Sequence, residues 1–110
     1  MTTSHPAHLE IGAPDDARAR TFFADLFGWT FTPMENGGWF DSGAIKTGLH
    51  GGDDRPAIVV YFDVPDIEAA VARVRDLGGT ADDPTPEEPG FGRFSTCLDP
   101  QGVRFGLRQG

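Results

Sequence analysis

The sequence predicts an α+β fold built from two successive βαβββ units. Three observations predict it: an internal repeat, two amphipathic helical segments that each follow a short apolar strand, and a high content of turn residues. The chain has 110 residues, of which 15 are glycines and 9 are prolines, and 38% are hydrophobic. This length fits one compact domain, and the glycines and prolines suit many short strands joined by turns.

The repeat relates segment 14–28 to segment 65–79 without a gap. The segments just before them, 7–11 and 58–62, both have the apolar character of strands. A repeat of about half the chain predicts two similar units, the first at about 6–50 and the second at about 57–108, joined by 51–56. The identical pairs are Pro14/Pro65, Asp15/Asp66, Ala19/Ala70, Asp25/Asp76, Leu26/Leu77 and Gly28/Gly79.

Each unit contains one predicted helix with a start signal and an end signal. Asp15 and Asp66 are expected N-caps, because a carboxylate accepts hydrogen bonds from the free N–H groups of the first turn. Gly28 and the pair at 78–79 are expected to supply the left-handed ends. Apolar residues at helical spacing predict one buried face for each helix. These are Ala19, Phe22, Phe23, Leu26 and Phe27 in the first helix, and Ile67, Ala70, Val71, Val74 and Leu77 in the second.

Three short strands are expected after each helix. In the first unit they are 29–33, 39–41 and 44–49, with Asn36-Gly37 as a hairpin signal. In the second unit they are 80–81, 93–98 and 103–108, after a loop that is rich in proline and acidic residues. The turn Asp99-Pro100-Gln101-Gly102 joins the last two strands into a hairpin.

The net charge and the cysteine content argue against several kinds of partner and of site. The formal net charge is -8, which argues against nucleic acid and anionic membranes as partners. The single cysteine, Cys97, excludes an intrachain disulfide and a metal site of clustered cysteines. Residues 1–8 lack the pattern of a secretion signal, and no apolar run approaches the roughly 20 residues of a membrane-spanning helix. We therefore expect a cytoplasmic protein.

The ordered set of motifs resembles the vicinal-oxygen-chelate superfamily, which contains glyoxalases, bleomycin-resistance proteins and dioxygenases. The matching pieces are His8-Leu9-Glu10-Ile11, Pro14-Asp15, Phe22-Phe23, Leu26-Phe27-Gly28-Trp29 and the turn 99–105 before the last strand. The similarity covers almost the whole chain and is closest to short glyoxalase-like bacterial proteins. It implies a single domain over 1–110, an eight-stranded mixed sheet cupped around a cavity with helices outside, and a homodimer.

The same resemblance implies that the usual metal site is degenerate. Metal-dependent members place ligands on the first and last strands of the units, and His8 matches the first position. The other two positions fall on Val59 or Val60 and on Gly106, which have no ligating side chain. No cofactor is therefore expected. The alternative is a divalent metal held by His8, Glu10 and His50, with one position left open for substrate.

Strand alternation predicts which side chains accompany these positions on one sheet face. Glu10 accompanies His8, Tyr61 accompanies Val59, and Arg104 accompanies Gly106. His8 and Glu10 are the candidate catalytic pair, able to move a proton next to a carbonyl. The candidate ligand-binding residues are Trp39, Tyr61, Phe94, Thr96 and Arg104. The simpler alternatives are core packing for Trp39 and Tyr61 and a solvated sheet end for the arginine.

These residues leave four functions open. The preferred hypothesis is a small-molecule-binding protein that takes an amphipathic ligand without a metal. The alternative is a glyoxalase-like lyase, isomerase or dioxygenase, either metal-free through Glu10 and His8 or metal-dependent through His8, Glu10 and His50. A purely structural subunit leaves Glu10 unexplained, because an unpartnered carboxylate is costly to bury. The acidic pair Asp53-Asp54 is interpreted as a solvated loop face.

Overall fold

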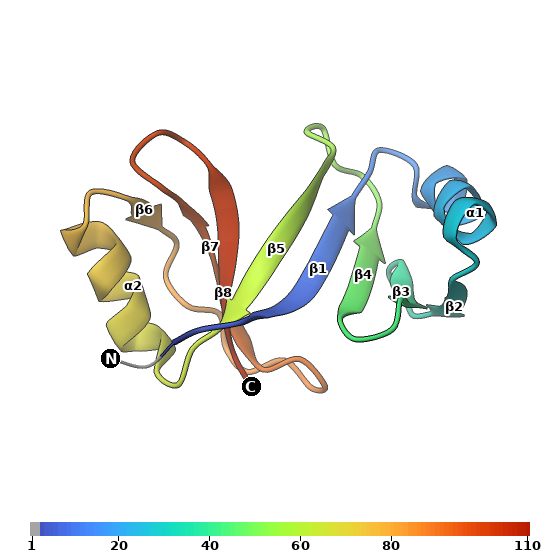
Figure 1. Ribbon diagram of the computed structural model, residues 1–110. Coiled ribbons are helices and arrows are strands. Elements are labelled where there is room, and N and C mark those ends of the chain that lie inside the picture. The colour runs from blue at the N-terminus through green and yellow to red at the C-terminus, as the bar shows by residue number, and fades with distance from the viewer. Residues whose placement is uncertain (1–2) are drawn as a thin grey trace. The chain divides into compact units, whose positions relative to one another are not determined.

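The computed structural model describes residues 3–110, which divide into two units with the same order of elements (Figure 1). The N-terminal unit is residues 7–60, and the C-terminal unit is residues 61–110 together with 3–6. The first half of the chain forms β1 (Pro6–Gly12), α1 (Asp16–Phe27), β2 (Thr30–Pro33), β3 (Gly38–Asp41) and β4 (Lys46–His50). The second half forms β5 (Ala57–Asp63), α2 (Ile67–Asp76), β6 (Thr80–Ala81), β7 (Arg93–Leu98) and β8 (Arg104–Gln109). The predicted strands match these bounds to within two residues.

Strand pairing repeats between the two units. In the N-terminal unit the strand order is β2-β3-β4-β1, with β1 parallel to β4 and the other pairs antiparallel. In the C-terminal unit the order is β6-β7-β8-β5, with β5 parallel to β8 and the other pairs antiparallel. The common topology confirms the two βαβββ units predicted from the internal repeat.

Both helices begin at the predicted caps. The Asp15 carboxylate accepts from the N–H of Arg18 at 3.2 Å, and the Asp66 carboxylate accepts from the N–H of Ala69 at 3.2 Å. Gly28 ends α1 in the left-handed region with φ 70°, and its N–H donates to the Ala24 carbonyl at 2.8 Å. The start of α2 has a further partner, because the side-chain oxygen of Gln109 accepts from the N–H of Ile67 at 2.8 Å.

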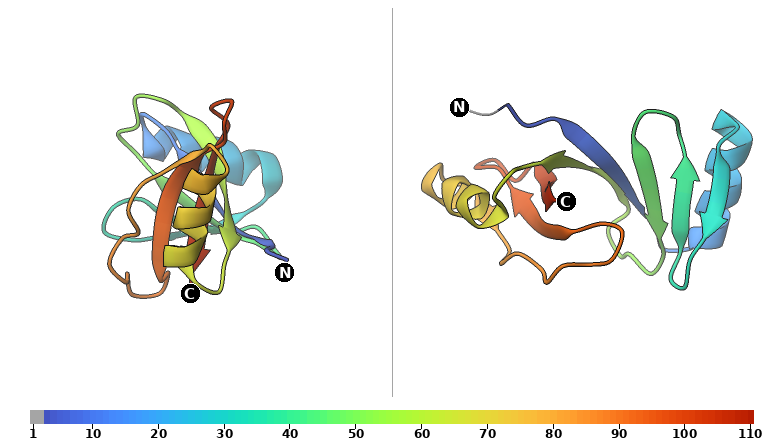
Figure 2. Two further views of the ribbon diagram at one scale, coloured as in Figure 1. Left: turned by 90° about the vertical axis from the view of Figure 1, so that its left-hand side faces the viewer. Right: turned by 90° about the horizontal axis from the view of Figure 1, so that it is seen from below.

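Each unit buries its core between its sheet and its helix (Figure 2). In the N-terminal unit the core is Ile11, Phe40 and Leu49, with Phe23 and Trp29 packed against it. In the C-terminal unit the buried core residues are Ile67, Val71, Cys97 and Leu107. Cys97 is therefore a core residue, and burial raises the pKa of its thiol, which is the opposite of an activated nucleophile.

The prediction that the apolar residues of α1 form one buried face is wrong. Phe23 packs inward against Trp29 and Phe40, with ring centroids 6.3 and 6.5 Å apart. Phe22 and Leu26 remain 60% and 58% exposed. Successive helix residues lie about 100° apart around the axis, so a sheet that takes residue 23 leaves residue 22 on the flank. The helix has more apolar side chains than its own sheet covers.

Neither helix of the described region, residues 3–110, combines the length and the hydropathy that crossing a membrane requires.

Candidate functional site

One face of the N-terminal sheet carries polar and aromatic side chains. The pairing of β1 with β4 sets His8 beside Lys46 and Glu10 beside Gly48, and β3 sets Trp39 beside Gly48. Paired residues point to the same side of a sheet, and their neighbours along each strand point to the other. Ile11 and Leu49 lie on that other side, in the core against α1. The face turned away from α1 therefore holds His8, Glu10, Trp39, Lys46 and His50.

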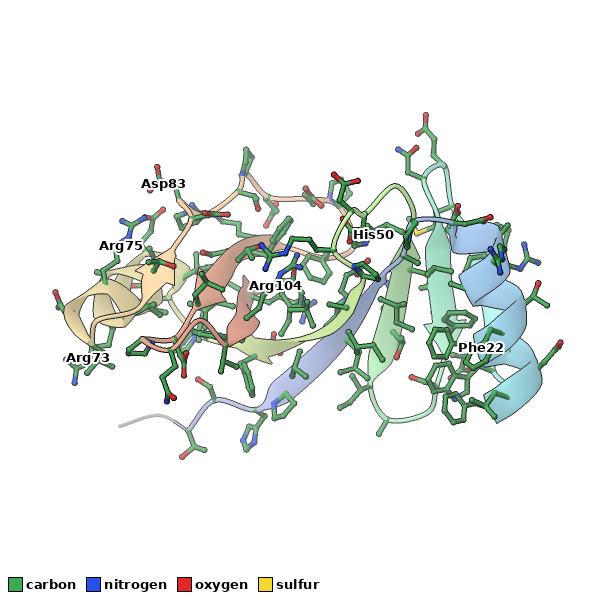
Figure 3. All side chains as sticks on the ribbon, turned by 90° about the horizontal axis from the view of Figure 1, so that it is seen from above. Phe22, His50, Arg73, Arg75, Asp83 and Arg104 are labelled. Atoms are coloured by element: carbon green, nitrogen blue, oxygen red, sulfur yellow. The ribbon has the colours of Figure 1, made fainter. Side chains whose placement is uncertain are left out.

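Three side chains on this face and the Asp53 carboxylate from the loop after β4 form a continuous chain of hydrogen bonds. His8 Nε2 lies 2.9 Å from Glu10 Oε1, and His50 Nδ1 lies 2.6 Å from Glu10 Oε2. The other ring nitrogen of His50, Nε2, lies 2.7 Å from Asp53 Oδ2. His8 is buried, whereas 39% of the His50 side chain is exposed at the end of β4 (Figure 3). The chain runs from the interior to the surface.

Two glycines leave the space that this chain of side chains occupies. A Cβ at Gly48 would overlap Glu10 Oε1 and would lie 3.1 Å from His8 Nε2. A Cβ at Gly12 would overlap Asp53 Oδ2 and would lie 2.9 Å from His50 Nε2. Side chains from the adjacent strand or loop fill the volume that a side chain at either glycine would need. Glycine is required at these positions because its neighbours approach the backbone closely, and not because the backbone needs a left-handed conformation.

The interpretation of Asp53 as a solvated loop residue is wrong. The backbone after β4 folds back onto the end of β1, with the Ala13 N–H donating to the His50 carbonyl and the Asp53 N–H donating to the Ala13 carbonyl, both at 3.1 Å. The Gly52 N–H donates to the Pro14 carbonyl at 3.1 Å. This fold-back brings the Asp53 carboxylate, 32% exposed, onto the outer nitrogen of His50.

The environment of His50 favours its charged form. Partial burial of the ring acts to lower its pKa, but hydrogen bonds to Glu10 and Asp53 and Coulombic attraction to both carboxylates outweigh burial. The net effect is that the pKa of His50 is raised above its ordinary value of 6.5. An imidazolium donates from both ring nitrogens, and a carboxylate oxygen only accepts. The protonated ring therefore satisfies Glu10 and Asp53 together.

The residues of the alternative metal site do not converge as ligands. Each oxygen of Glu10 is taken by one imidazole, His8 on one side and His50 on the other. Within residues 3–110, no group of three or more His, Cys, Asp and Glu side chains is placed to hold a metal ion. A divalent cation needs several donors directed at one point, with imidazoles in their neutral form. As placed, this donor set fits a hydrogen-bond relay and does not fit a cation.

The C-terminal sheet presents an aromatic face on the side away from α2. The register sets Tyr61 and Thr96 on either side of Gly106, and sets Asp63 and Phe94 on either side of Arg108. The residues between them, such as Leu107 and Cys97, lie in the core against α2. Tyr61, Phe94 and Thr96 thus share one face, as strand alternation predicts, and their roles in binding remain predictions.

Tyr61 covers the position where the resemblance implies a metal-ligating carboxylate. A Cβ at Gly106 would overlap the Tyr61 ring. The Tyr61 ring also meets Phe91 and Phe94 edge to face, with centroids 6.0 Å apart in both cases, and Phe91 meets Phe94 at 5.7 Å. Phe91 is a site residue that sequence reasoning missed. Its signal is an aromatic residue between two glycines, Gly90 and Gly92, in an otherwise polar loop.

The two arginines of β8, Arg104 and Arg108, differ in their exposure to solvent. The Arg108 Nε donates to the Phe91 carbonyl at 2.7 Å, and its Nη1 donates to Asp63 at 3.0 Å. Its guanidinium lies 5.0 Å from the centre of the Phe91 ring. Arg104 is exposed near the start of the strand (Figure 3). Trp39 is half-buried, and the Lys46 ammonium lies 5.1 Å from the centre of its ring.

Comparisons with known proteins agree with this arrangement of elements. Residues 8–108 match the family model of the glyoxalase-like domain. The chain is 33% identical to an anthracycline biosynthesis protein, DauV, from Streptomyces sp. (strain C5), over 93% of this chain and 46% of that protein. The chain thus spans about half the length of the curated relatives that it matches.

Two solved structures show the same fold. A hypothetical protein from Bacillus halodurans matches with a TM-score of 0.78 and 14% identity, covering 99% of this chain and 96% of that one. Methylmalonyl-CoA epimerase from Mycobacterium tuberculosis matches with a TM-score of 0.71 and 20% identity, covering 99% of this chain and 91% of that one. The family match extends over nearly the whole length, and the fold is that of the glyoxalase/bleomycin-resistance group. The chain belongs to the glyoxalase-like domain family, within the vicinal-oxygen-chelate superfamily.

Proposed function

We propose that this protein binds an amphipathic aromatic small molecule that carries oxygen substituents, and that its family metal site is degenerate. The observation that carries the proposal is the Tyr61 ring over Gly106. At the last-strand position where the family resemblance implies a carboxylate ligand, this chain has no side chain. An aromatic ring that meets two further aromatic rings occupies that space.

The chemistry of this face suits a flat ligand with polar edges. Tyr61, Phe91 and Phe94 offer ring faces and edges to an aromatic partner. The Arg108 guanidinium beside Phe91 and the Thr96 hydroxyl beside Gly106 add hydrogen-bond donors for ligand oxygens. Small-molecule sites usually combine mostly apolar walls with a few polar groups of this kind.

The relatives named for anthracycline biosynthesis support the choice of a first ligand class. Anthracyclines are built on a planar hydroxyanthraquinone, which combines fused aromatic rings with neighbouring oxygens. We therefore propose hydroxyanthraquinones as the first probes. The compartment proposed for this activity is the cytoplasm, because a single cysteine, which has no partner for an intrachain disulfide, is compatible with a reducing compartment.

Binding of alizarin, a small hydroxyanthraquinone, tests the proposal by calorimetry and by the shift of the thermal unfolding midpoint. A ligand that binds only the folded state raises that midpoint. We expect Tyr61→Leu and Phe94→Ala each to weaken binding by roughly three- to tenfold. An aromatic pair contributes about 0.5–1.5 kcal/mol to the binding free energy beyond the effect of burying its apolar surface. Phe62→Leu, on the core side of β5, is the matched control and should leave the affinity unchanged. Failure of alizarin and of a panel of related hydroxyquinones to bind would contradict the proposal, as would equal weakening by all three variants.

The relay in the N-terminal unit favours a second candidate function, metal-free acid/base catalysis. Glu10 is held by two imidazoles and can accept a proton from a carbon next to a carbonyl, while His50 retains the positive charge beside it. The structural match to an epimerase supports methylmalonyl-CoA as a probe. Loss of its α-proton signal in D2O, followed by NMR, reports the transfer.

Substitution of Glu10 tests the second candidate function separately from the first. We expect exchange, if Glu10 is the base, to fall by at least about 100-fold in Glu10→Gln, since general-base catalysis contributes on the order of 10²–10⁴. Asp15→Asn, a change at a helix cap of the same unit, should retain it. Exchange that survives Glu10→Gln excludes Glu10 as the base. Metal analysis of the protein purified without a chelating tag tests the metal-dependent alternative, and stoichiometric bound metal would favour that alternative over both proposals.

A further inference from the structure

Lys46 is the only lysine of the chain, and it lies on the face of the N-terminal sheet that carries Glu10. The parallel pairing of β1 with β4 sets Lys46 beside His8, and the Lys46 ammonium lies 5.1 Å from the centre of the Trp39 ring. Lys46 is exposed and Trp39 is half-buried. A cation over an indole face is attracted electrostatically to the ring. Trp39 therefore holds the ammonium on this face of the sheet.

The positive charge of Lys46 has no carboxylate partner in the described part of the chain. Of the residues that the structure describes, three arginines form ion pairs with carboxylates, whereas Lys46 forms none. Acidic residues nevertheless outnumber basic ones by 17 to 9 in the sequence. Asp41, at the end of the neighbouring strand β3, accepts from the Gly43 N–H at 3.2 Å. A cation that the chain itself leaves without a carboxylate is available to an anionic ligand.

The ammonium and the candidate base approach the same part of β4. The Glu10 carboxylate occupies the space over Gly48, and Lys46 precedes Gly48 by two positions on the strand. Two strand residues span about 7 Å. The flexible four-carbon stem of lysine lets the ammonium cover much of that distance. A substrate that sets a carboxylate on Lys46 therefore brings the carbon next to that carboxylate toward Glu10.

We propose that Lys46 binds a carboxylate of the substrate, and that Trp39 is a positioning residue for Lys46. The substrates of this site are then carboxylates whose anionic group lies one or two bonds from the carbon that loses its proton. This assignment rests on the second candidate function, acid/base catalysis by Glu10, and names its substrate class.

Electrostatics give the physical reason for a cation at this place. The net charge of -8 repels free anions, and the Glu10 carboxylate repels them again at close range. An ammonium offsets this repulsion locally. It also donates charge-assisted hydrogen bonds to a carboxylate, which are stronger than hydrogen bonds between neutral groups. A carboxylate substrate without Lys46 would meet negative charge alone at the base.

Two thioesters that differ by one carboxylate, methylmalonyl-CoA and propionyl-CoA, test the proposal by titration calorimetry. Both carry the phosphates of CoA, so the difference between their affinities reports the carboxylate. We expect the wild-type chain to prefer methylmalonyl-CoA by roughly three- to tenfold, as for a charge-assisted hydrogen bond at a partly exposed site. Lys46→Met should remove this preference, and Lys46→Arg, which keeps the charge, should retain it.

The matched control is Arg73→Met, which removes one positive charge at an exposed position of α2. It should retain the preference of the wild-type chain. The proposal is overturned if the wild-type chain shows no preference, or if Lys46→Met keeps it. Equal weakening of both thioesters by Lys46→Met would assign the lysine to a phosphate of CoA and would also overturn the proposal. Circular dichroism of each variant verifies that the chain remains folded.

The single lysine allows a second readout that needs no turnover. Reductive methylation with ¹³C-formaldehyde labels Lys46 and the α-amino group, and it preserves the positive charge. The Trp39 ring should shift the labelled Lys46 resonance upfield in NMR spectra, and Trp39→Leu should remove that shift. Methylmalonyl-CoA should move the resonance further, whereas propionyl-CoA should leave it in place. A wild-type resonance at the position of free dimethyl-lysine would refute positioning by Trp39.

Glu10→Gln separates this proposal from the function on which it rests. The variant should lose exchange of the α-proton but keep the preference for methylmalonyl-CoA. A wild-type chain that shows the preference and no exchange would reject acid/base catalysis and support the carboxylate site. Where exchange occurs, Lys46→Met should raise KM more than it lowers kcat, because the ammonium binds substrate and transfers no proton. An unchanged KM in Lys46→Met would overturn the proposal.

Discussion

Gly48 lies directly beside Glu10 in the parallel pairing of β1 and β4, and the Glu10 carboxylate occupies the space that a side chain at position 48 would fill. The relay from His8 to Asp53 depends on this relationship, because Glu10 joins both imidazoles. A carboxylate in a half-buried position without such partners would be costly. The glycine is therefore as much a part of the relay as the side chains that form its hydrogen bonds.

The first prediction concerns that glycine. Gly48→Ala should destabilise the fold by about 1–3 kcal/mol, the usual range for an added methyl group in a packed interior. The penalty should largely disappear in a Glu10→Ala background, where the overlapping carboxylate is absent. Urea unfolding of the four proteins in this cycle measures the coupling. If Gly48→Ala costs the same free energy of unfolding in both backgrounds, the new methyl group does not contact the Glu10 carboxylate.

The second prediction concerns the pH dependence of stability through His50. Its pKa is raised in the folded chain, so protonation of the ring stabilises the fold. That contribution is complete below the unfolded pKa of about 6.5 and is lost as the pH rises through the higher folded pKa. The stability difference between wild type and His50→Gln should therefore be largest at low pH and shrink toward alkaline pH.

NMR titration of the imidazole resonances checks the same point directly. Asp53→Asn removes one of the two carboxylates and should lower the pKa of His50 relative to wild type. A His50 resonance that titrates below 6.5 in the wild-type chain would contradict the relay, because the geometry favours the imidazolium.

The third prediction concerns Gly106. Gly106→Ala should cost about 1–3 kcal/mol, because the new methyl group meets the Tyr61 ring. The cost should fall in a Tyr61→Ala background, and Gly110→Ala serves as a control because a Cβ there meets no atom closer than 3.5 Å. Denaturant unfolding of these variants measures the coupling, and its absence would remove the structural reason for a glycine at 106.

The fourth prediction concerns the side-chain cap that β8 supplies to α2. Ile67 is fully buried, and its N–H donates to the side-chain oxygen of Gln109. Gln109→Ala should destabilise the fold by about 1–3 kcal/mol, the cost of an unsatisfied buried donor. Gln101→Ala, in the exposed turn between β7 and β8, should change stability by less than about 0.5 kcal/mol. Hydrogen exchange at the Ile67 amide should accelerate in the first variant only.

Much of the architecture followed from local signals in the sequence. The capping aspartates, the left-handed glycine after α1 and the turn at 99–102 are each determined by residues a few positions away. The repeat then required the two units to share one topology. Alternation along β1 predicted that His8 and Glu10 share a face, since that relation needs only the period of a strand.

The parts that sequence reasoning missed depend on contacts between distant segments. Asp53 reaches His50 only because the loop after β4 bonds back to residues 13 and 14. Phe91 joins Tyr61 across thirty positions, from a loop whose composition indicates solvent exposure. The outward position of Phe22 depends on how α1 is rotated over its sheet, which periodicity alone does not determine.

The close fit between Tyr61 and position 106 limits which side chains position 106 can accept. A carboxylate side chain introduced at position 106 would meet the Tyr61 ring, so such a variant is expected to show a folding defect. Such a side chain requires a smaller residue at position 61, and that change removes the ring contacts of Tyr61 with Phe91 and Phe94. The ring at position 61 thus determines what position 106 can carry, although the two residues lie on different strands, 45 positions apart in the sequence.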